Sequence, residues 1–408
     1  MSATVSLKTI QQARARIASS IARTPCEFSV GLSEMFGARV FVKLDNLQAT
    51  GAFKERGAAN KLLQLSDAER KRGVVTASAG NHGLGVAYQA KKLGVSATVV
   101  MPKNAPLVKR ANIARLGGKV VLHGDTFDES VTHAREIERS EKKVFLHGFD
   151  DLDVIAGQGT LGLEIVEAVP DLDIIIVPVG GGGLIAGIGS AVKAMRPQAK
   201  VIGVEPACYA SMQAAVKAGK PVAIDATPTI ADGLAVRRVG ALPLEVAGPL
   251  IDELVTVTED EIAQAILMLL EMEKTVVEGA AATTLAALLA GKVNVRGKTV
   301  ALPLCGGNID MTMIANIIER GLAKDGRLVC LRTFVSDKPG SLAAVARIIA
   351  DAGASVKQVD HNRAFGHIEP GGVEVEWILE TRGHEHIIEL IQKLREKKIR
   401  VQSDATSG

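Results

Sequence analysis

The sequence has few of the features that mark secreted, membrane-spanning or nucleic-acid-binding proteins. Only 4 of its 408 residues are cysteines and none forms a CxxC pair, which disfavours a zinc site and a disulfide framework. Aromatic residues make up 3% of the chain, and the net charge is +3 without a basic run, so nucleic acid is a poor candidate partner. No apolar run reaches the ~18 residues of a transmembrane helix, and the first residues, MSATVSLKTI, do not form a signal peptide. We therefore expect a cytoplasmic protein that binds neither nucleic acid nor membrane.

The central part of the chain alternates short apolar runs with helical patterns. Strands are predicted at 74–78, 96–102, 119–122, 173–179, 201–205 and 298–304. Helices are predicted over 84–94, up to about 115, and over 126–140, 184–195, 260–272 and 279–290. This alternation predicts an α/β fold of right-handed βαβ units, in two blocks at about 50–150 and 155–320. Ligands of such sheets lie beyond the carboxyl ends of the strands.

The pattern changes after about Lys324. Strands and helices then follow in the order β-α-β-β-α-β, over segments such as RLVCLRTFVSD, PGSLAAVARIIADAG and GGVEVEWILETRG. This order is the split βαβ unit, which stands as a small domain of its own. DGR at 325–327 marks the expected boundary.

Lys54 stands where a helix is expected to begin, in the stretch ATGAFKERGAAN. The partial positive charge of a helix N-terminus disfavours a cation there. An amine that is also partly desolvated loses its proton more easily and becomes a nucleophile. The plain alternative is a surface lysine in the first helical turn.

Four consecutive glycines, Gly180, Gly181, Gly182 and Gly183, follow a predicted buried strand and open a helix at Leu184. Backbone N–H groups that converge at a helix N-terminus bind an anion, and phosphate is the natural guest. Residues 181–186 also fit the looser dinucleotide pattern G-x-G-x-x-A, with Glu205 at the end of the next strand. This segment alone therefore leaves a nicotinamide-dependent oxidoreductase open.

Two further strand ends carry polar groups. Ser78, Ala79, Gly80, Asn81 and His82 follow one strand and precede a helix, an arrangement suited to a carboxylate, although Ser78 could simply be an N-cap. Cys305 ends another strand beside two glycines, and no adjacent histidine or acid makes it a nucleophile. Pyridoxal phosphate that holds an amino acid would use all four features: a lysine nucleophile, a phosphate-binding loop, a carboxylate-binding loop and a polar group at a strand end. A nicotinamide site needs no such lysine.

These motifs resemble the fold-type II pyridoxal-phosphate enzymes, which are similar to the tryptophan synthase β chain, and within them the threonine/serine ammonia-lyases (dehydratases). The resemblance is carried by residues 51–58, 78–82, 180–183 and 305–308. Residues 337–342, DKPGSL, are similar to an ACT regulatory domain. The resemblance implies a large cofactor-binding lobe of 1–52 and 153–322, a small lobe of 53–152, and an ACT domain of 327–408.

The resemblance also implies residue roles. Lys54 would hold pyridoxal 5'-phosphate covalently and remove the substrate Cα proton, with Phe53 packed near the ring. Gly180, Gly181, Gly182, Gly183 and Leu184 would contact the phosphate, Asn81 the phenolic oxygen, and Cys305 the pyridine nitrogen. Ser78, Ala79, Gly80, Asn81 and His82 would surround the substrate carboxylate. The implied reaction is deamination of L-threonine to 2-oxobutanoate and ammonia, and of L-serine to pyruvate, regulated by an amino acid.

Some residues depart from the resemblance. Ala52 and Leu84 stand where many relatives carry serine and glutamine, which leaves the substrate preference open. Ala79 replaces the serine that related racemases use as an acid/base, so racemisation is disfavoured, although a racemase and a hydroxyaspartate ammonia-lyase remain alternatives. A non-catalytic amino-acid sensor is a further alternative, against which intact Lys54 argues. Glu205 matches the start of a divalent-metal site in some relatives, but no metal is assigned. By resemblance the protein is expected to be a homodimer or homotetramer.

Overall fold

The computed structural model describes residues 4–363 and 371–403. The chain divides into two compact units, Met1–Ile309 and Asp310–Gly408. In the described part of the chain, no helix has both the length and the apolar character needed to cross a membrane.

The first unit contains a six-stranded sheet. Its strands follow the order β1 (Cys26–Phe28), β2 (Arg39–Lys43), β10 (Thr299–Pro303), β7 (Ile174–Pro178), β8 (Lys200–Pro206) and β9 (Glu253–Val257). Only β1 pairs antiparallel with its neighbour, and the other pairs are parallel. Every residue of β7 and β10 is buried, as expected for strands covered by helices on both faces.

A second, smaller sheet of the same unit has the order β5 (Lys119–Leu122), β4 (Ala97–Met101), β3 (Val74–Ala77) and β6 (Val144–Phe145). All three pairings are parallel. The predicted central strands are therefore present, and their division between a mostly parallel and a fully parallel sheet confirms the α/β expectation. The chain crosses back between β3 and β4 through α5 (Asn81–Lys92).

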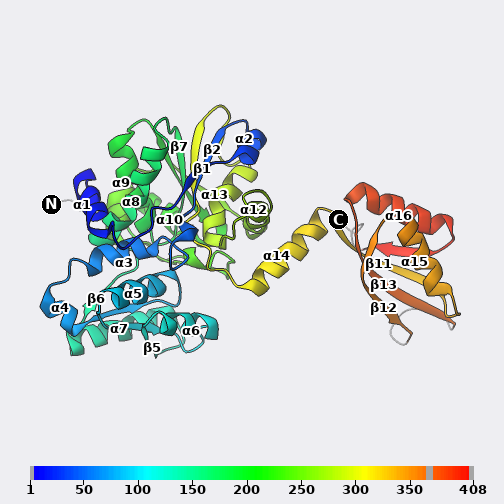
Figure 1. Cartoon of the computed structure of the whole chain (residues 1–408), viewed down its shortest axis with the longest axis horizontal. Helices are drawn as coiled ribbons and strands as arrows, with labels where there is room; N and C mark the ends of the chain where they lie inside the picture. Colours follow the sequence, from blue (N-terminus) through cyan, green and yellow to red (C-terminus); the bar gives the residue numbers. More distant parts are fainter. Residues whose placement is uncertain (1–3, 364–370, 404–408) are drawn as a thin grey trace. The chain divides into compact units, whose positions relative to one another are not determined.

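Helices surround both sheets (Figure 1). Besides α5 they are α1 (Leu7–Ile17), α2 (Val30–Phe36), α3 (Lys54–Leu62), α4 (Asp67–Arg72), α6 (Leu107–Arg115), α7 (Phe127–Glu141), α8 (Leu152–Ala168), α9 (Gly183–Met195), α10 (Ser211–Ala218), α11 (Ala241–Ala247), α12 (Glu259–Met272) and α13 (Gly279–Leu289). Short 3-10 helices are η1 (Asp45–Leu47), η2 (Ala207–Tyr209) and η3 (Asp232–Leu234).

Helix α3 lies between α5 and α8 and so connects the parts of the unit that carry the two sheets (Figure 1). Glycines permit close packing here: a Cβ on Gly157 of α8 would lie 2.6 Å from the Cα of Gly57, and one on Gly187 of α9 would lie 2.5 Å from the backbone nitrogen of Gly159. Because backbones meet directly, α3 has little freedom to shift against α8. The position of the first turn of α3 is thus set by the core of the unit.

The C-terminal unit begins with α14 (Met311–Lys324), ahead of the boundary expected at 327. It continues as β11 (Leu328–Ser336), α15 (Ser341–Asp351), β12 (Ser355–Asn362), β13 (Gly372–Glu380), α16 (His384–Glu396) and β14 (Arg400–Ser403), which is the predicted β-α-β-β-α-β order. The strands form an antiparallel sheet in the order β12-β13-β11-β14.

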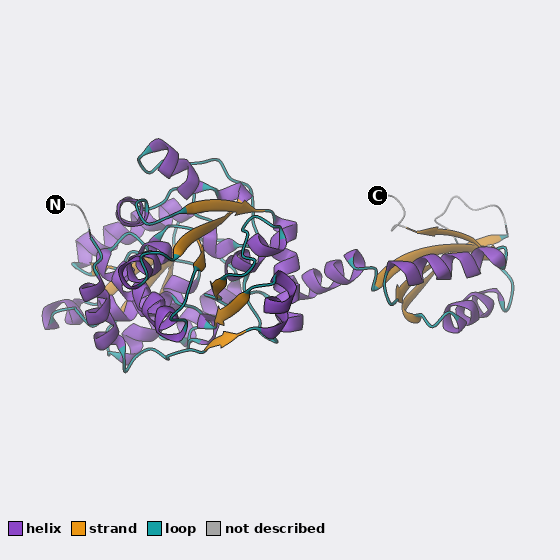
Figure 2. Ribbon diagram, turned by 90° about the horizontal axis from the view of Figure 1, so that it is seen from above, coloured by secondary structure: helices purple, strands orange, loops and turns teal. Residues whose placement is uncertain are grey.

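The core of this unit follows from alternation along β13. Its residues are buried at every second position, and Val375, Trp377 and Leu379 share one hydrophobic core with buried residues of α15 and α16. Helices of this unit lie beside its sheet (Figure 2). The indole N–H of Trp377 donates to the hydroxyl of Thr333 at 2.9 Å, which satisfies the polar group of the largest buried side chain. The unit therefore has its own hydrophobic core.

Candidate active site

Lys54 is the first residue of α3, as predicted, and its side chain is partly buried. Its amine donates to the carbonyl oxygen of Gly148 at 2.8 Å and lies 5.2 Å from the centre of the Phe53 ring. Burial lowers the pKa of Lys54 from 10.5 to about 8, while the charges of Glu278 and Cys305 oppose that shift. The expected direction is confirmed, and desolvation is the main cause. The amine is therefore available as a base or nucleophile near neutral pH.

The backbone places Phe53 and Cys305 next to one another. Ala52 forms a β-bridge with Gly306, and the N–H of Phe53 donates to the Cys305 carbonyl at 2.9 Å. The start of α3 is thereby attached to the residues that follow β10. Two motifs about 250 residues apart in the sequence meet at this bridge.

Cys305 is buried, and its thiol lies 3.3 Å from the carbonyl oxygen of Pro303. Burial and the nearby acids Asp45 and Glu278 raise the pKa of this thiol well above 9.0. The group therefore stays a neutral thiol, in keeping with the expectation that it is not a nucleophile.

Asn81 opens α5, three residues before the predicted helix start. Its amide nitrogen donates to both carboxylate oxygens of Glu278, at 2.8 and 3.0 Å. Its amide oxygen accepts from the side chain of Asn308 at 2.8 Å. The structure thus joins the start of α5 to residues beside Cys305.

The loop before Asn81 is held by Ser78. The Ser78 hydroxyl accepts from the backbone N–H groups of Gly80 at 3.2 Å and Gly83 at 3.0 Å, although the N-cap residue of α5 is Gly80 and not Ser78. A Cβ built on Gly80 would meet no described atom within 4 Å, so open space adjoins the helix start. Ala79 is partly buried against a small apolar cluster.

The His82 side chain is buried. Its Nε2 lies 3.1 Å from the Leu146 carbonyl oxygen, and its buried Nδ1 has no hydrogen-bond partner among the described residues. Burial lowers the pKa of His82 to about 3, so the imidazole is neutral. The histidine side chain thus serves packing, and its backbone N–H belongs to the first turn of α5.

The glycine run follows β7 and leads into α9. Gly182 has a φ of 89°, a conformation that favours glycine. A Cβ on Gly181 or Gly183 would lie 2.3 or 2.9 Å from Phe149, so packing also requires glycine there. Leu184, in the first turn of α9, is buried in the main core. No described side chain caps α9, and its first N–H groups are therefore available to an anion.

These positions fit a carbonyl cofactor that carries a phosphate. An uncapped N-terminus of a 13-residue helix suits the phosphate, and a partly buried lysine amine of lowered pKa suits the carbonyl. The open space at Gly80 leaves room for a further group.

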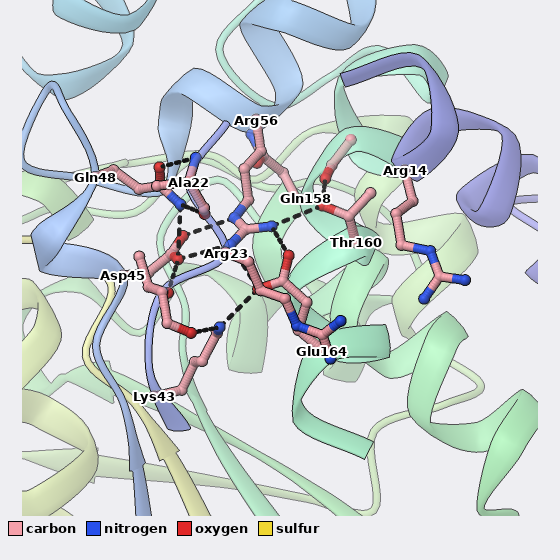
Figure 3. A network of polar contacts seen from close by, with 12 residues as sticks. Arg14, Ala22, Arg23, Lys43, Asp45, Gln48, Arg56, Gln158, Thr160 and Glu164 are labelled. Carbon is pink, nitrogen blue, oxygen red and sulfur yellow. Dashed lines mark hydrogen bonds and ion pairs between the residues drawn. The ribbon is translucent and has the colours of Figure 1, made fainter. Parts of the chain in front are cut away.

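A buried network of four charged side chains is centred on Arg56, two residues after Lys54 (Figure 3). The guanidinium of Arg56 donates to Asp45 twice at 2.8 Å, and to Glu164 at 2.7 and 2.9 Å. A fifth bond, to the Thr160 hydroxyl at 3.1 Å, matches its five N–H donors. Lys43 donates to Glu164 at 2.6 Å and balances the charge. The network fixes the first turn of α3 to η1 and α8.

Glu205 has a separate role. Its buried carboxylate accepts from the backbone N–H groups of Met212 at 2.6 Å and Gln213 at 3.0 Å, at the start of α10. Both oxygens are thus engaged within the chain, which removes the acid on which the dinucleotide alternative depended. Within the described residues, no cluster of histidine, cysteine or acidic side chains suits a metal ion.

Sequence reasoning missed Glu278, Asn308 and the charged network around Arg56. Glu278 sits in the segment VVEGAAATT, which has no polar pattern that would single it out. Arg56 lies two residues from Lys54, but its burial follows only from the packing of α3 on α8. A polar role for Asn308 could have been predicted from the sequence, because this residue ends the motif CGGN after a predicted strand.

Comparison with known proteins assigns the chain to a family. Residues 17–306 match the family described as pyridoxal-phosphate dependent enzyme. The chain is 46% identical over 398 residues to L-threonine ammonia-lyase of Thermotoga maritima, covering 98% of this chain and 99% of that protein.

Two solved structures are also similar. Processed threonine deaminase isoform 2 of Solanum lycopersicum has a TM-score of 0.72 at 35% identity and covers 78% of this chain and 90% of its own. Maize serine racemase has a TM-score of 0.74 at 34% identity and covers 78% of this chain and 98% of its own. Taken with the lysine, the glycine loop and the strand-end residues, these matches mean that the chain belongs to the pyridoxal-phosphate dependent enzymes of fold-type II.

Proposed function

We propose that this protein is a threonine ammonia-lyase. It converts L-threonine to 2-oxobutanoate and ammonia, and L-serine to pyruvate and ammonia. The β-hydroxyl leaves as water, and one water is taken up when the nitrogen leaves as ammonia, so the atoms balance. The observation that carries the proposal is the Lys54 amine of lowered pKa, in a chain similar along 98% of its length to an L-threonine ammonia-lyase.

The residues divide the work as follows. Pyridoxal phosphate, when bound, supplies the electron-withdrawing system that stabilises negative charge at the substrate Cα. Lys54 holds the cofactor and removes the Cα proton, and Phe53 packs near the ring. Gly180, Gly181, Gly182, Gly183 and Leu184 bind its phosphate through backbone N–H groups at the start of α9.

The remaining residues orient cofactor and substrate. Asn81 would contact the phenolic oxygen of the cofactor, and the neutral thiol of Cys305 would lie at its pyridine nitrogen. The Ser78–His82 loop receives the substrate carboxylate at the uncapped start of α5 and beside the open space at Gly80. A neutral thiol does not enforce protonation of the pyridine nitrogen, which favours prompt loss of the hydroxyl.

Racemisation is the second candidate, because maize serine racemase is a structural relative. Ala79 opposes it, since an alanine side chain cannot carry a proton to the opposite face of Cα. Steady-state rates on L-threonine, L-serine, D-serine and threo-3-hydroxyaspartate test the assignment. L-threonine is expected to be deaminated fastest, and faster formation of D-serine from L-serine than of 2-oxobutanoate from L-threonine would contradict it.

We further propose that residues 1–52 and 153–322 form a large cofactor-binding lobe, and residues 53–152 a small one. Residues 327–408 would be an ACT domain that binds an amino-acid effector between copies of the chain, in a homodimer or homotetramer. The β-α-β-β-α-β order of the C-terminal unit supports this. Removal of residues 327–408 is expected to leave basal turnover and to abolish the response to branched-chain amino acids. A response that survives would place regulation elsewhere.

A further inference from the structure

Glu278 is a buried carboxylate where three segments of the site meet. Its side chain is 5% exposed, and both oxygens accept from the amide of Asn81, at 2.8 and 3.0 Å. Its own N–H donates to the Gly306 carbonyl at 3.0 Å. Although Glu278 is the N-cap residue of α13, its side chain makes no capping hydrogen bond within the described chain. The carboxylate is therefore directed at Asn81 instead of at its own helix.

A directional hydrogen-bond chain runs from this carboxylate. The Asn81 amino group donates to Glu278, whose ionised carboxylate only accepts, and this turns the Asn81 oxygen toward Asn308. The Asn308 amide nitrogen donates to that oxygen at 2.8 Å and to the Thr50 carbonyl at 2.7 Å. Acceptor-only groups at both ends thus fix which way the Asn81 amide points.

The chain also bridges the two sheets of the first unit. Asn81 begins the helix that follows β3 of the smaller sheet, whereas Glu278 and Asn308 flank β10 of the larger one. Ser78, Ala79 and Gly80 directly precede that helix, and Asn81 and His82 are its first two residues. Holding Asn81 therefore holds the loop at the open space beside Gly80.

The charges around Glu278 leave its carboxylate without a close cation. No ion pair joins it to a basic side chain among the described residues. The charged or titratable groups that act on it or face it are Lys54 of α3, Asp232 of η3, Lys109 of α6 and Cys305 after β10. Burial raises the pKa of Glu278 to about 7. Such an unpaired carboxylate is costly, which argues that its contact with Asn81 has a use.

We propose that Glu278 is a positioning residue that fixes the Asn81 amide, and through it the Ser78–His82 loop, against the residues that follow β10. The inference rests on the proposed function in that Asn81 is taken as a cofactor contact. This role requires, at position 278, a side chain that is as long as glutamate and that only accepts hydrogen bonds.

The test is a double-mutant cycle on cofactor affinity. We prepare three single variants as full-length, cofactor-free protein: Glu278→Gln, Glu278→Asp and Asn81→Ala. Two double variants combine Asn81→Ala with each of the two substitutions at Glu278. The Kd for pyridoxal phosphate is measured by absorbance titration. Glu278→Gln puts a donor opposite the Asn81 amino group, and Glu278→Asp is too short to reach it. Each is expected to weaken binding about tenfold to a hundredfold, the range of a hydrogen bond to a charged group.

Coupling decides between positioning and other roles. In the Asn81→Ala background, either substitution at 278 is expected to add less than about a twofold effect. The proposal is overturned if the effects of the substitutions at Glu278 and Asn81 on the Kd are fully additive. It is also overturned if Glu278→Asp binds the cofactor with wild-type affinity, because a negative charge without the contact to Asn81 would then be enough. If Glu278→Gln does not fold, as judged by circular dichroism, the cycle with Glu278→Asp decides.

Glu205→Gln is the matched control, because Glu205 is also buried and its pKa is also raised to about 7. It binds backbone N–H groups of α10 and not Asn81, so cofactor affinity is expected to stay within about twofold. A tenfold loss in this control would contradict the specific role of Glu278. If Glu278 and Asn81 are coupled in cofactor affinity but the protein does not turn over L-threonine, only the proposed function is refuted. If the protein turns over L-threonine but the two residues are not coupled, only this inference is refuted.

Discussion

Two lysines of the first unit, Lys43 and Lys54, contrast in their partners. Lys43 is 1% exposed and donates to the Glu164 carboxylate at 2.6 Å and to the Thr24 carbonyl at 2.6 Å. Lys54 is less buried, yet its amine has only the Gly148 carbonyl within hydrogen-bond distance in the described structure. A buried lysine with a carboxylate partner is a structural cation, whereas a desolvated lysine without one gives up its proton. The partner, more than burial, separates the two roles.

Removal of the unpaired lysine is expected to have the largest effect. Lys54→Ala should lower kcat/KM for L-threonine by at least about a thousandfold, because in the proposed function this amine both holds the cofactor and removes the proton. The measurement is 2-oxobutanoate formation by protein whose circular dichroism matches wild type. Lys61→Ala, on the same helix but paired with Asp151 and Asp153, is the control and should retain most activity. Substantial turnover by Lys54→Ala would end the assignment.

Removal of the paired lysine should act on stability. Lys43→Met leaves Asp45, Arg56 and Glu164 with one uncompensated negative charge in the interior. A broken buried ion pair typically costs about 3–5 kcal/mol. Calorimetry of the cofactor-free chain should show the transition of the first unit at lower temperature, with that of the C-terminal unit unchanged. An unchanged first transition would mean that Lys43 is not part of the charge balance.

The pH dependence sharpens the comparison. The pKa of Lys54 is about 8 in the folded chain, whereas its ordinary value is 10.5. Between pH 8 and pH 10.5 the lysine therefore binds fewer protons in the folded chain than in the unfolded chain. Its contribution to the unfolding free energy therefore rises with pH from about 8 to 10.5, and Lys54→Ala should remove that rise.

Labelling of the same amine provides a direct measurement. In the cofactor-free chain, acetylation of Lys54 followed by mass spectrometry should be half-maximal near pH 8. Because the Glu278 charge raises the pKa of Lys54, Glu278→Gln should move that midpoint to lower pH. A midpoint near 10.5 would contradict the account of Lys54.

The smallest effect is expected at an exposed ion pair. Lys109 and Asp232 approach to 2.5 Å, but their side chains are 36% and 53% exposed. Lys109→Met should change the unfolding free energy by less than about 1 kcal/mol, as is usual for exposed pairs. A loss as large as that of Lys43→Met would contradict the distinction between buried and exposed pairs.

The predicted elements agree with the structure where periodicity was clear. Strands 119–122 and 74–78 and helix 126–140 are matched within one residue at each end, because short β-branched runs form the strands and a Thr126–Glu129 capping box begins the helix. Helix α8 was not predicted: it is buried on nearly all sides and rich in glycine, so it lacks an amphipathic stripe. The start of α5 was placed three residues late, because the apolar pattern of this segment begins only at Leu84, whereas the helix begins at Asn81.

By itself the sequence determined the chemistry: a lysine at a helix start, a glycine run after a buried strand, a Ser78–His82 loop and a cysteine at a strand end. Each is a local pattern, and local backbone requirements impose it. Only the tertiary structure decided that Phe53 meets Cys305, that Glu278 faces Asn81, and that Arg56 is enclosed by Asp45 and Glu164. The physical reason is that burial and charge pairing depend on segments brought together from across the chain, about which no short stretch of sequence carries information.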